Sequence, residues 1–250
     1  MTNKNKTYLL VGISVVAFVA MLSISPIRQD PAFHNFADGR EIASIQNFMN
    51  VISNLPFLLL GTAGLWMISK RRPIGAFGKL KTSCIVFLVG IFFTGIGSAF
   101  YHLNPNNSTL IWDRLPMTVS FMAFFSILTG VLINQKIGKL FLWPLILFGI
   151  ISILYWGMYD DLRLYALVQF LPILLTPLML IVYKTNNNLK KYFWSMALLY
   201  AIAKLFEALD IETFYLLGFV SGHTIKHLFA AGVPAVFLLM YRREMSKVFP

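Results

Sequence analysis

The residues best suited to chemistry are histidines, and two of the four, His223 and His227, are spaced four positions apart. On an α-helix this spacing places both imidazole rings on one face, one turn apart, where they can share a metal ion. Thr224 occupies the position at which an HExxH metalloprotease carries its glutamate base, so a hydrolase needs a base from another segment. Taken alone, the pair also fits two polar side chains bonded to neighbouring helices.

A second group of candidate residues flanks a short polar segment at 104–107. Ser98 lies one helical turn before His102, and Asp113 follows the segment. A short connection makes the flanking helices antiparallel neighbours, so we expect Ser98, His102 and Asp113 to lie close together. Taken singly, Asp113 also suits a helix N-cap, and Ser98 suits a small packing residue between helices.

Together these residues have the composition of a hydrolytic metal site. The single cysteine, Cys84, lies in an apolar run, so a metal ion would be held by histidines and carboxylates. Three histidines with one open position are the ligand set of a catalytic zinc ion. A nearby carboxylate such as Asp113 could take a proton from the water that the ion activates.

The elements that must position these residues are membrane spans. The chain has 250 residues, of which 58% are hydrophobic and 12% charged, whereas a soluble domain has about 25% charged residues. A span must satisfy its own backbone hydrogen bonds, which predicts an all-α integral membrane protein. Eight apolar segments approach the ~20 residues that a span needs, and they cover residues 7–25, 48–69, 82–103, 110–133, 139–157, 163–183, 192–209 and 217–241.

The first apolar segment requires its own interpretation. Lys4 and Lys6 precede it, a pattern that also fits a signal peptide. The stretch is long, and Pro26 directly after Ser23–Ser25 makes a poor cleavage site. We therefore expect an uncleaved N-terminal transmembrane helix within residues 1–26.

The charges between the segments predict the orientation. With eight spans and a cytoplasmic N-terminus, the cytoplasmic side receives 15 of the 21 basic residues and one of the ten acidic residues, Glu244. The positive-inside bias of cytoplasmic loops accounts for the excess of Lys and Arg that gives the chain its net charge of +11. No motif indicates nucleic-acid binding. Both termini are then cytoplasmic, and all four histidines lie toward the outer, periplasmic or lumenal, face. The 15 residues are Lys4, Lys6, Lys70, Arg71, Arg72, Lys79, Lys81, Lys136, Lys139, Lys184, Lys190, Lys191, Arg242, Arg243 and Lys247.

Four motifs of this sequence resemble those of the alkaline ceramidases, in the same order between about residues 34 and 241. They are Asn50-Val51-Ile52-Ser53-Asn54 (NxxSN), Ser98 to His102 (SxxxH), Asp113-Arg114-Leu115-Pro116-Met117 (DELPM-type) and His223 to His227 (HxxxH). The resemblance extends to a wider superfamily that includes adiponectin-type receptors.

The resemblance implies a seven-helix zinc amidohydrolase domain at residues 27–250, which acts on a membrane lipid with an N-acyl chain. His102, His223 and His227 would be the zinc ligands. Asp113 would be the general base, and Ser98 would bond the attacking water or the developing oxyanion. His34 lies outside the matched motifs and is left out of the site.

Two departures from the family pattern affect other residues. Arg114 replaces the acidic residue that usually follows Asp113, which bears on the entrance to the site. Animal members also carry an N-terminal calcium site with a DxxE pattern, which Asp38 and Glu41 fit, whereas Ala43 and Asn47 stand where further ligands would be expected. Calcium is thus a second possible cofactor, and the alternative is a solvated loop with Asp38 or Glu41 paired to Arg40.

Charged residues near the predicted seventh span allow two interpretations. Lys204 and Glu207, one turn apart, predict either a mutually satisfied structural pair or the lining of a substrate pocket. Lys226 lies between His223 and His227 in the sequence, and we expect it on another helical face.

The leading hypothesis is a zinc-dependent membrane hydrolase that cleaves the amide of a ceramide-like lipid. The alternative is a lipid-sensing receptor or binding protein with a structural zinc site. Ser98 and Asp113, which are not needed as ligands, favour catalysis. A transporter or proton channel is disfavoured because the ionisable residues gather toward one face instead of following a path across the membrane.

Overall fold

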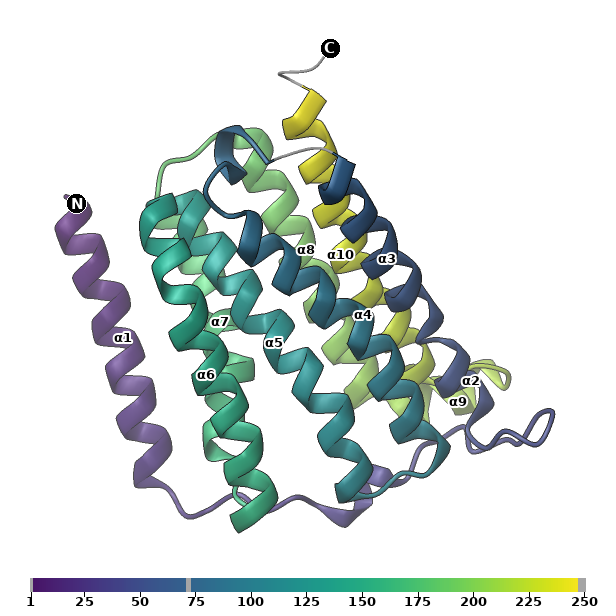
Figure 1. Cartoon of the computed structure of the whole chain (residues 1–250). Coiled ribbons are helices and arrows are strands. Elements are labelled where there is room, and N and C mark those ends of the chain that lie inside the picture. Colours follow the sequence, from purple (N-terminus) through teal and green to yellow (C-terminus); the bar gives the residue numbers. More distant parts are fainter. Residues whose placement is uncertain (1, 71–72, 247–250) are drawn as a thin grey trace.

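The computed structural model describes residues 2–70 and 73–246, and within these ranges the chain forms helices and no β-strand. The helices pack side by side into one bundle (Figure 1). The α-helices are α1 Asn3–Ser23, α2 Phe48–Ile52, α3 Leu55–Lys70, α4 Lys81–Leu103, α5 Asn107–Leu132, α6 Gln135–Tyr159, α7 Arg163–Val182, α8 Asn187–Ala208, α9 Asp210–Leu217 and α10 Gly222–Ser246. Two short 3₁₀ helices, η1 Pro31–His34 and η2 Gly75–Phe77, lie in the connections.

The helices confirm the predicted all-α, multi-pass membrane architecture. Seven are long and apolar enough to cross a membrane, with α2 and α3 together making one span, and the pair α8–α9 brings the number to eight. Several helix boundaries differ from the predicted segments by up to five residues, and the start of the last span is the one that changes the architecture, because residues 217–221 do not belong to it. Instead α8 bends by 79° into the short α9, which ends at Leu217 and is followed by Gly218 with a positive φ of 73°, before α10 begins at Gly222.

Helix α1 lies at the edge of the bundle, packed against α7 (Figure 1). Only 6% of its apolar window is buried, so most of its surface is available to lipid. Its C-terminal end is tied to α7 by Arg163, whose guanidinium donates hydrogen bonds to the backbone oxygens of Leu22 and Ile24 at 3.2 and 2.7 Å.

The pairing of α4 with α5 controls the geometry of the site. Asn106 caps α5 by accepting from the backbone N–H groups of Ser108 and Thr109, so the helix starts well before Asp113. Asp113 is therefore not the N-cap that its position suggested. Gly97 of α4 lies directly against the backbone carbonyl of Trp112, with no room for a Cβ atom. This close approach, typical of small residues between membrane helices, brings the neighbouring positions 98 and 113 together.

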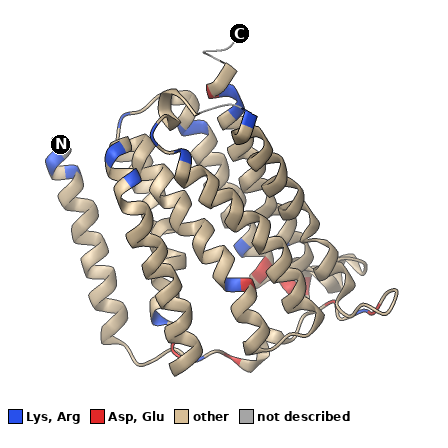
Figure 2. Cartoon of the chain, in the orientation of Figure 1, with Lys and Arg blue, Asp and Glu red and all other residues tan. Residues whose placement is uncertain are grey.

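Basic residues gather at the end of the bundle where α1 begins and α10 ends, and most acidic residues lie in the opposite half (Figure 2). Arg71, Arg72 and Lys247 lie outside the described residues. The separation of charge is the pattern on which the predicted orientation depends, and the histidines of the site lie in the acidic half.

Candidate metal centre

Three histidines converge at one end of the bundle. His102 comes from the last turn of α4, and His223 and His227 come from the first turns of α10. All three are buried, and one ring nitrogen from each lies within 4.8 Å of the others. The i, i+4 pair therefore shares a helical face as predicted, and the group could hold a metal ion.

The hydrogen bonding of His102 fits a metal ligand. Its side chain is fully buried, and neither ring nitrogen has a hydrogen-bond partner in the part of the chain that is described. A buried nitrogen left without a partner costs about 1–3 kcal/mol. A metal ion bound to the imidazole lone pair would remove that cost for one of the two nitrogens. The backbone oxygen of His102 is held by Asn47, whose side-chain amide donates to it at 2.9 Å.

His227 is held in the orientation that a metal ligand requires. Its Nδ1 atom lies 2.7 Å from the Ser53 hydroxyl, which donates its own proton to the Asn50 backbone oxygen at 3.0 Å. Since a serine hydroxyl has one proton, it must accept from Nδ1–H, which leaves the Nε2 lone pair of His227 free. A hydrogen bond of this kind behind a metal-binding imidazole fixes both the tautomer and the ring orientation.

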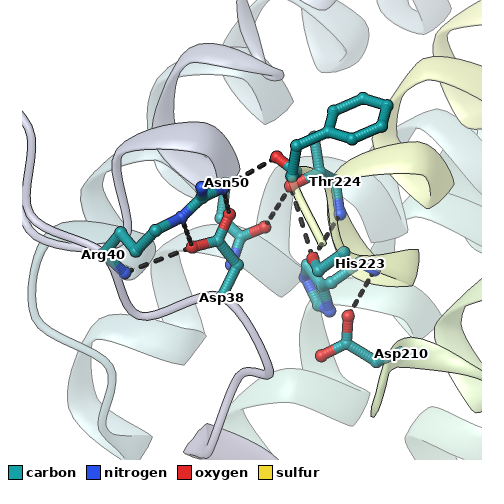
Figure 3. A network of polar contacts seen from close by, with 8 residues as sticks. Asp38, Arg40, Asn50, Asp210, His223 and Thr224 are labelled. Atoms are coloured by element: carbon teal, nitrogen blue, oxygen red, sulfur yellow. Dashed lines mark hydrogen bonds and ion pairs between the residues drawn. The ribbon is translucent and has the colours of Figure 1, made fainter. Parts of the chain in front are cut away.

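Asn50 connects the same motif to the start of α10. Its side-chain oxygen accepts a 2.8 Å hydrogen bond from the Thr224 hydroxyl, next to His223 (Figure 3). Asn50 and Ser53, which the sequence singled out only as part of the NxxSN resemblance, thus position both histidines of α10.

Asp210 was not expected to support the histidines, yet it does so directly. The backbone N–H of His223 donates to one carboxylate oxygen at 2.6 Å (Figure 3), and the backbone N–H of Ala37 donates to the other at 2.9 Å. One carboxylate therefore caps the first turn of α10 and ties it to the loop between α1 and α2. The bend between α8 and α9 is what brings Asp210 to this position.

The loop that contains Ala37 covers the histidines. The ring of Phe36 packs against the rings of His102 and His223, with centroid separations of 4.6 and 4.5 Å. His34 donates or accepts at Tyr101 and Asn107, both at 2.9 Å, and does not join the histidine group.

Asp38 anchors the next part of this loop. Both of its oxygens accept from the Arg40 guanidinium at 2.7 Å, and Arg40 also donates to the Phe219 backbone oxygen (Figure 3). Burial acts to raise the pKa of the Asp38 carboxyl, but the hydrogen bonds and charge of Arg40 outweigh it and hold the pKa below 3.8. Glu41 is exposed. Asp38 is thus paired with Arg40, as in the alternative to a calcium site. Calcium binding at Asp38 and Glu41 stays a prediction.

Ser98 and Asp113 lie together, as their spacing predicted. Their side chains form a hydrogen bond, and both residues line the same cavity as His227. Asp113 is buried, and its Oδ1 atom has no hydrogen-bond partner among residues 2–70 and 73–246. A carboxylate oxygen free to accept a proton therefore lies at the cavity that His227 also lines.

The side chain of Arg114 does not line the cavity that Ser98 and Asp113 share. Its guanidinium is buried among the rings of Phe33, Trp156 and Tyr165, at 5.2, 4.4 and 4.8 Å from their centroids. Such cation–π contacts stabilise a buried cation without a carboxylate. The residue that departs from the family motif therefore joins η1 to α5, α6 and α7.

The expectation that Lys226 lies on a helical face away from the histidines was wrong. Its ammonium is 3.1 Å from His223 Nε2 and 3.1 Å from a Glu207 oxygen, and Lys226 lines the cavity. Residues three apart share a helical face, and the long side chain reaches back one turn. Glu207 also pairs with Lys204, so the predicted Lys204–Glu207 pair is present and continues to Lys226.

The cavity that begins at Ser98, Asp113, Lys226 and His227 has a volume of about 160 Å³. It runs between α3, α4, α5, α7, α8 and α10, and its wall is mainly apolar. Its apolar side chains include Phe57, Phe87, Ile91, Phe121, Phe124 and Val233. A polar, ionisable end joined to an apolar channel suits an amphipathic ligand with a hydrocarbon chain.

Residues 40–210 match the family model described as Ceramidase. This region contains Ser98, His102 and Asp113, while His223 and His227 lie beyond it and join the site through the fold. A comparison with curated proteins finds no match.

Proposed function

The chain belongs to the ceramidase family, and we propose that it is a zinc-dependent amidohydrolase of the membrane. Its substrate would be a ceramide-like N-acyl lipid, and its products a fatty acid and a sphingoid base or other amine. The observation that carries this proposal is the group of three buried histidines, of which His227 lines the same mainly apolar cavity as Asp113 and Ser98.

His102, His223 and His227 would hold the zinc ion. Zinc, when bound, acts as a Lewis acid that polarises the amide carbonyl and lowers the pKa of water. Ser53, Asn50 and Asp210 would keep the imidazoles in place, and Phe36 would shield the histidines on the loop side.

Asp113 would accept the proton of the attacking water at its unpartnered Oδ1 atom and then deliver it to the amide nitrogen as the amine leaves. Ser98 would orient the Asp113 carboxylate and donate to the developing oxyanion. The acyl chain would lie in the apolar part of the cavity, which places its amide at the depth of these groups.

The orientation forms part of the proposal. We infer that both termini face the cytoplasm and that the site faces the periplasm or lumen, since basic residues gather at the end where α1 begins and α10 ends.

The direct experiment incubates purified protein with a panel of N-acyl lipids, with and without a zinc chelator, and identifies the products by mass spectrometry. The proposal predicts release of fatty acid and amine from a ceramide-like lipid, and loss of this activity with the chelator. An Asp113→Ala variant is expected to keep zinc and lose turnover. Lipid binding without turnover by the zinc-loaded wild type would instead support a receptor.

A further inference from the structure

Lys226 places a positive charge at the wall of the cavity. Its side chain is 16% exposed, and its ammonium contacts Glu207 on α8 and His223 on its own helix, both at 3.1 Å. A lysine within a membrane span is costly, which usually indicates a functional role. Here Glu207 offsets part of the cost and fixes the position of the ammonium.

The charges around Lys226 do not cancel. Glu207 carries one negative charge and pairs with two ammonium groups, those of Lys204 and Lys226, so this cluster has an excess of one positive charge. Of the two lysines, Lys226 is the one that lines the cavity. Among the described residues, the cavity wall holds this cation and one carboxylate, Asp113.

The ammonium also has hydrogen-bonding capacity to spare. It carries three N–H donors, of which one points to Glu207. A second lies 3.1 Å from His223 Nε2, and it is released when the lone pair of that imidazole binds zinc. The third is available to a ligand in the cavity. Because Glu207 already has Lys204 as a partner, neutralising Glu207 does not by itself require Lys226.

We propose that Lys226 is a further catalytic residue, whose ammonium binds the negative charge that forms on the acyl carbonyl oxygen and that remains on the fatty-acid product. This inference rests on the proposed amide hydrolysis and adds a residue to its site. A fixed cation suits this role because the charge develops in a largely apolar cavity, where electrostatic interactions are stronger than in water.

The chemistry balances without a further reactant. The oxygen of water bonds to the acyl carbon while its proton passes to Asp113, and the carbonyl π electrons move to the oxygen that Lys226 faces. The carbonyl then re-forms as the carbon–nitrogen bond breaks, and the nitrogen takes the proton from Asp113. The acid and amine exchange the last proton to give carboxylate and ammonium. Lys226 keeps its own protons throughout and donates a hydrogen bond.

The test compares binding of a fatty-acid anion with binding of the primary alcohol of the same chain length, for example palmitate and hexadecanol. Zinc-loaded protein in detergent micelles is used, and zinc content is measured for each preparation. The wild type is expected to prefer the anion. Lys226→Met keeps the length of the side chain without its charge, and it is expected to lose that preference at least tenfold. Its kcat for amide hydrolysis should fall about 100-fold with little change in KM, the effect of removing one oxyanion donor.

Three further variants separate this role from ion pairing. Lys226→Arg retains a cation and should retain the anion preference. Glu207→Gln breaks the ion pair but leaves the ammonium, so the preference should survive, whereas equal losses in Glu207→Gln and Lys226→Met would overturn the proposal. Lys191→Met removes an exposed charge at the far end of α8 and should change neither readout.

The two proposals fail in different ways. If zinc-loaded wild type hydrolyses no amide lipid, the proposed function fails, and the binding preference is still measured. If Lys226→Met keeps both the anion preference and the wild-type kcat, the role of Lys226 is contradicted while the hydrolase remains.

Discussion

Replacing Ser53 by alanine is expected to weaken zinc binding without removing a ligand. The Ser53 hydroxyl is the acceptor for His227 Nδ1–H at 2.7 Å, and both side chains are buried. In the variant that proton loses the hydroxyl that accepts it, yet it must stay on Nδ1 whenever Nε2 binds a metal ion. The metal-free imidazole can change tautomer or rotate, so the cost falls mainly on the metal-bound state.

The expected magnitude follows from this contact. An unpaired buried donor costs about 1–3 kcal/mol. Since 1.4 kcal/mol corresponds to a tenfold change in affinity, zinc should bind about 5- to 140-fold more weakly. This range overlaps the roughly 10- to 100-fold loss expected when a hydrogen-bond partner behind a metal ligand is removed.

The assay is competition for zinc between the metal-stripped protein in detergent micelles and a chelator of known affinity. Ser152→Ala is the matched control, because Ser152 is also buried and donates its hydroxyl proton to Gly149 of its own helix, at 2.6 Å. Its zinc affinity should equal that of the wild type. A Ser53→Ala protein with wild-type helicity and unchanged zinc affinity would refute the reasoning.

Three further predictions concern the supports of the site. Asp210→Ala removes the hydrogen bonds from the backbone N–H groups of His223 and Ala37. It should destabilise the protein by about 0.5–2 kcal/mol, measured as a lower Tm. An unchanged Tm and an unchanged zinc affinity would count against this role of Asp210. Gly97→Ala places a methyl group against the Trp112 carbonyl and should cost about 1–3 kcal/mol and reduce hydrolysis, whereas Gly12→Ala, with open space around it, should do neither. Because the folded-state pKa of Asp38 is depressed, its stabilising pair with Arg40 is present above pH 3.8 and is lost as the pH falls through the folded-state pKa. Asp38→Asn should therefore lower the Tm at pH 7 but have little effect below that folded-state pKa, and a constant difference across this range would contradict the assignment.

The spans and the convergence of the histidines could be predicted because both depend on local spacing. Apolar runs of membrane-spanning length, the i, i+4 separation of His223 and His227, and the short connection after His102 require no knowledge of distant contacts. The bend into α9 was missed because residues 217–221 are apolar enough to read as a continuation of the last span.

The supporting residues were beyond local reasoning because their partners are distant in sequence. Ser53 and His227 are separated by 174 positions, and Asp210 contacts Ala37 across 173 positions. Lys226 was misplaced for a different reason: its separation of three from His223 already allowed a shared face, and the length of its side chain decided the contact.

The central claim is that the three histidines hold the zinc ion on which hydrolysis of an N-acyl lipid depends. The most direct measurement determines zinc per chain and ceramide hydrolysis on the same purified preparations of wild type and His223→Ala. We expect about one zinc ion per chain with hydrolysis in the wild type, and loss of both in the variant. A wild-type protein that hydrolyses ceramide without zinc, or a His223→Ala protein that keeps both metal and hydrolysis, would contradict the account.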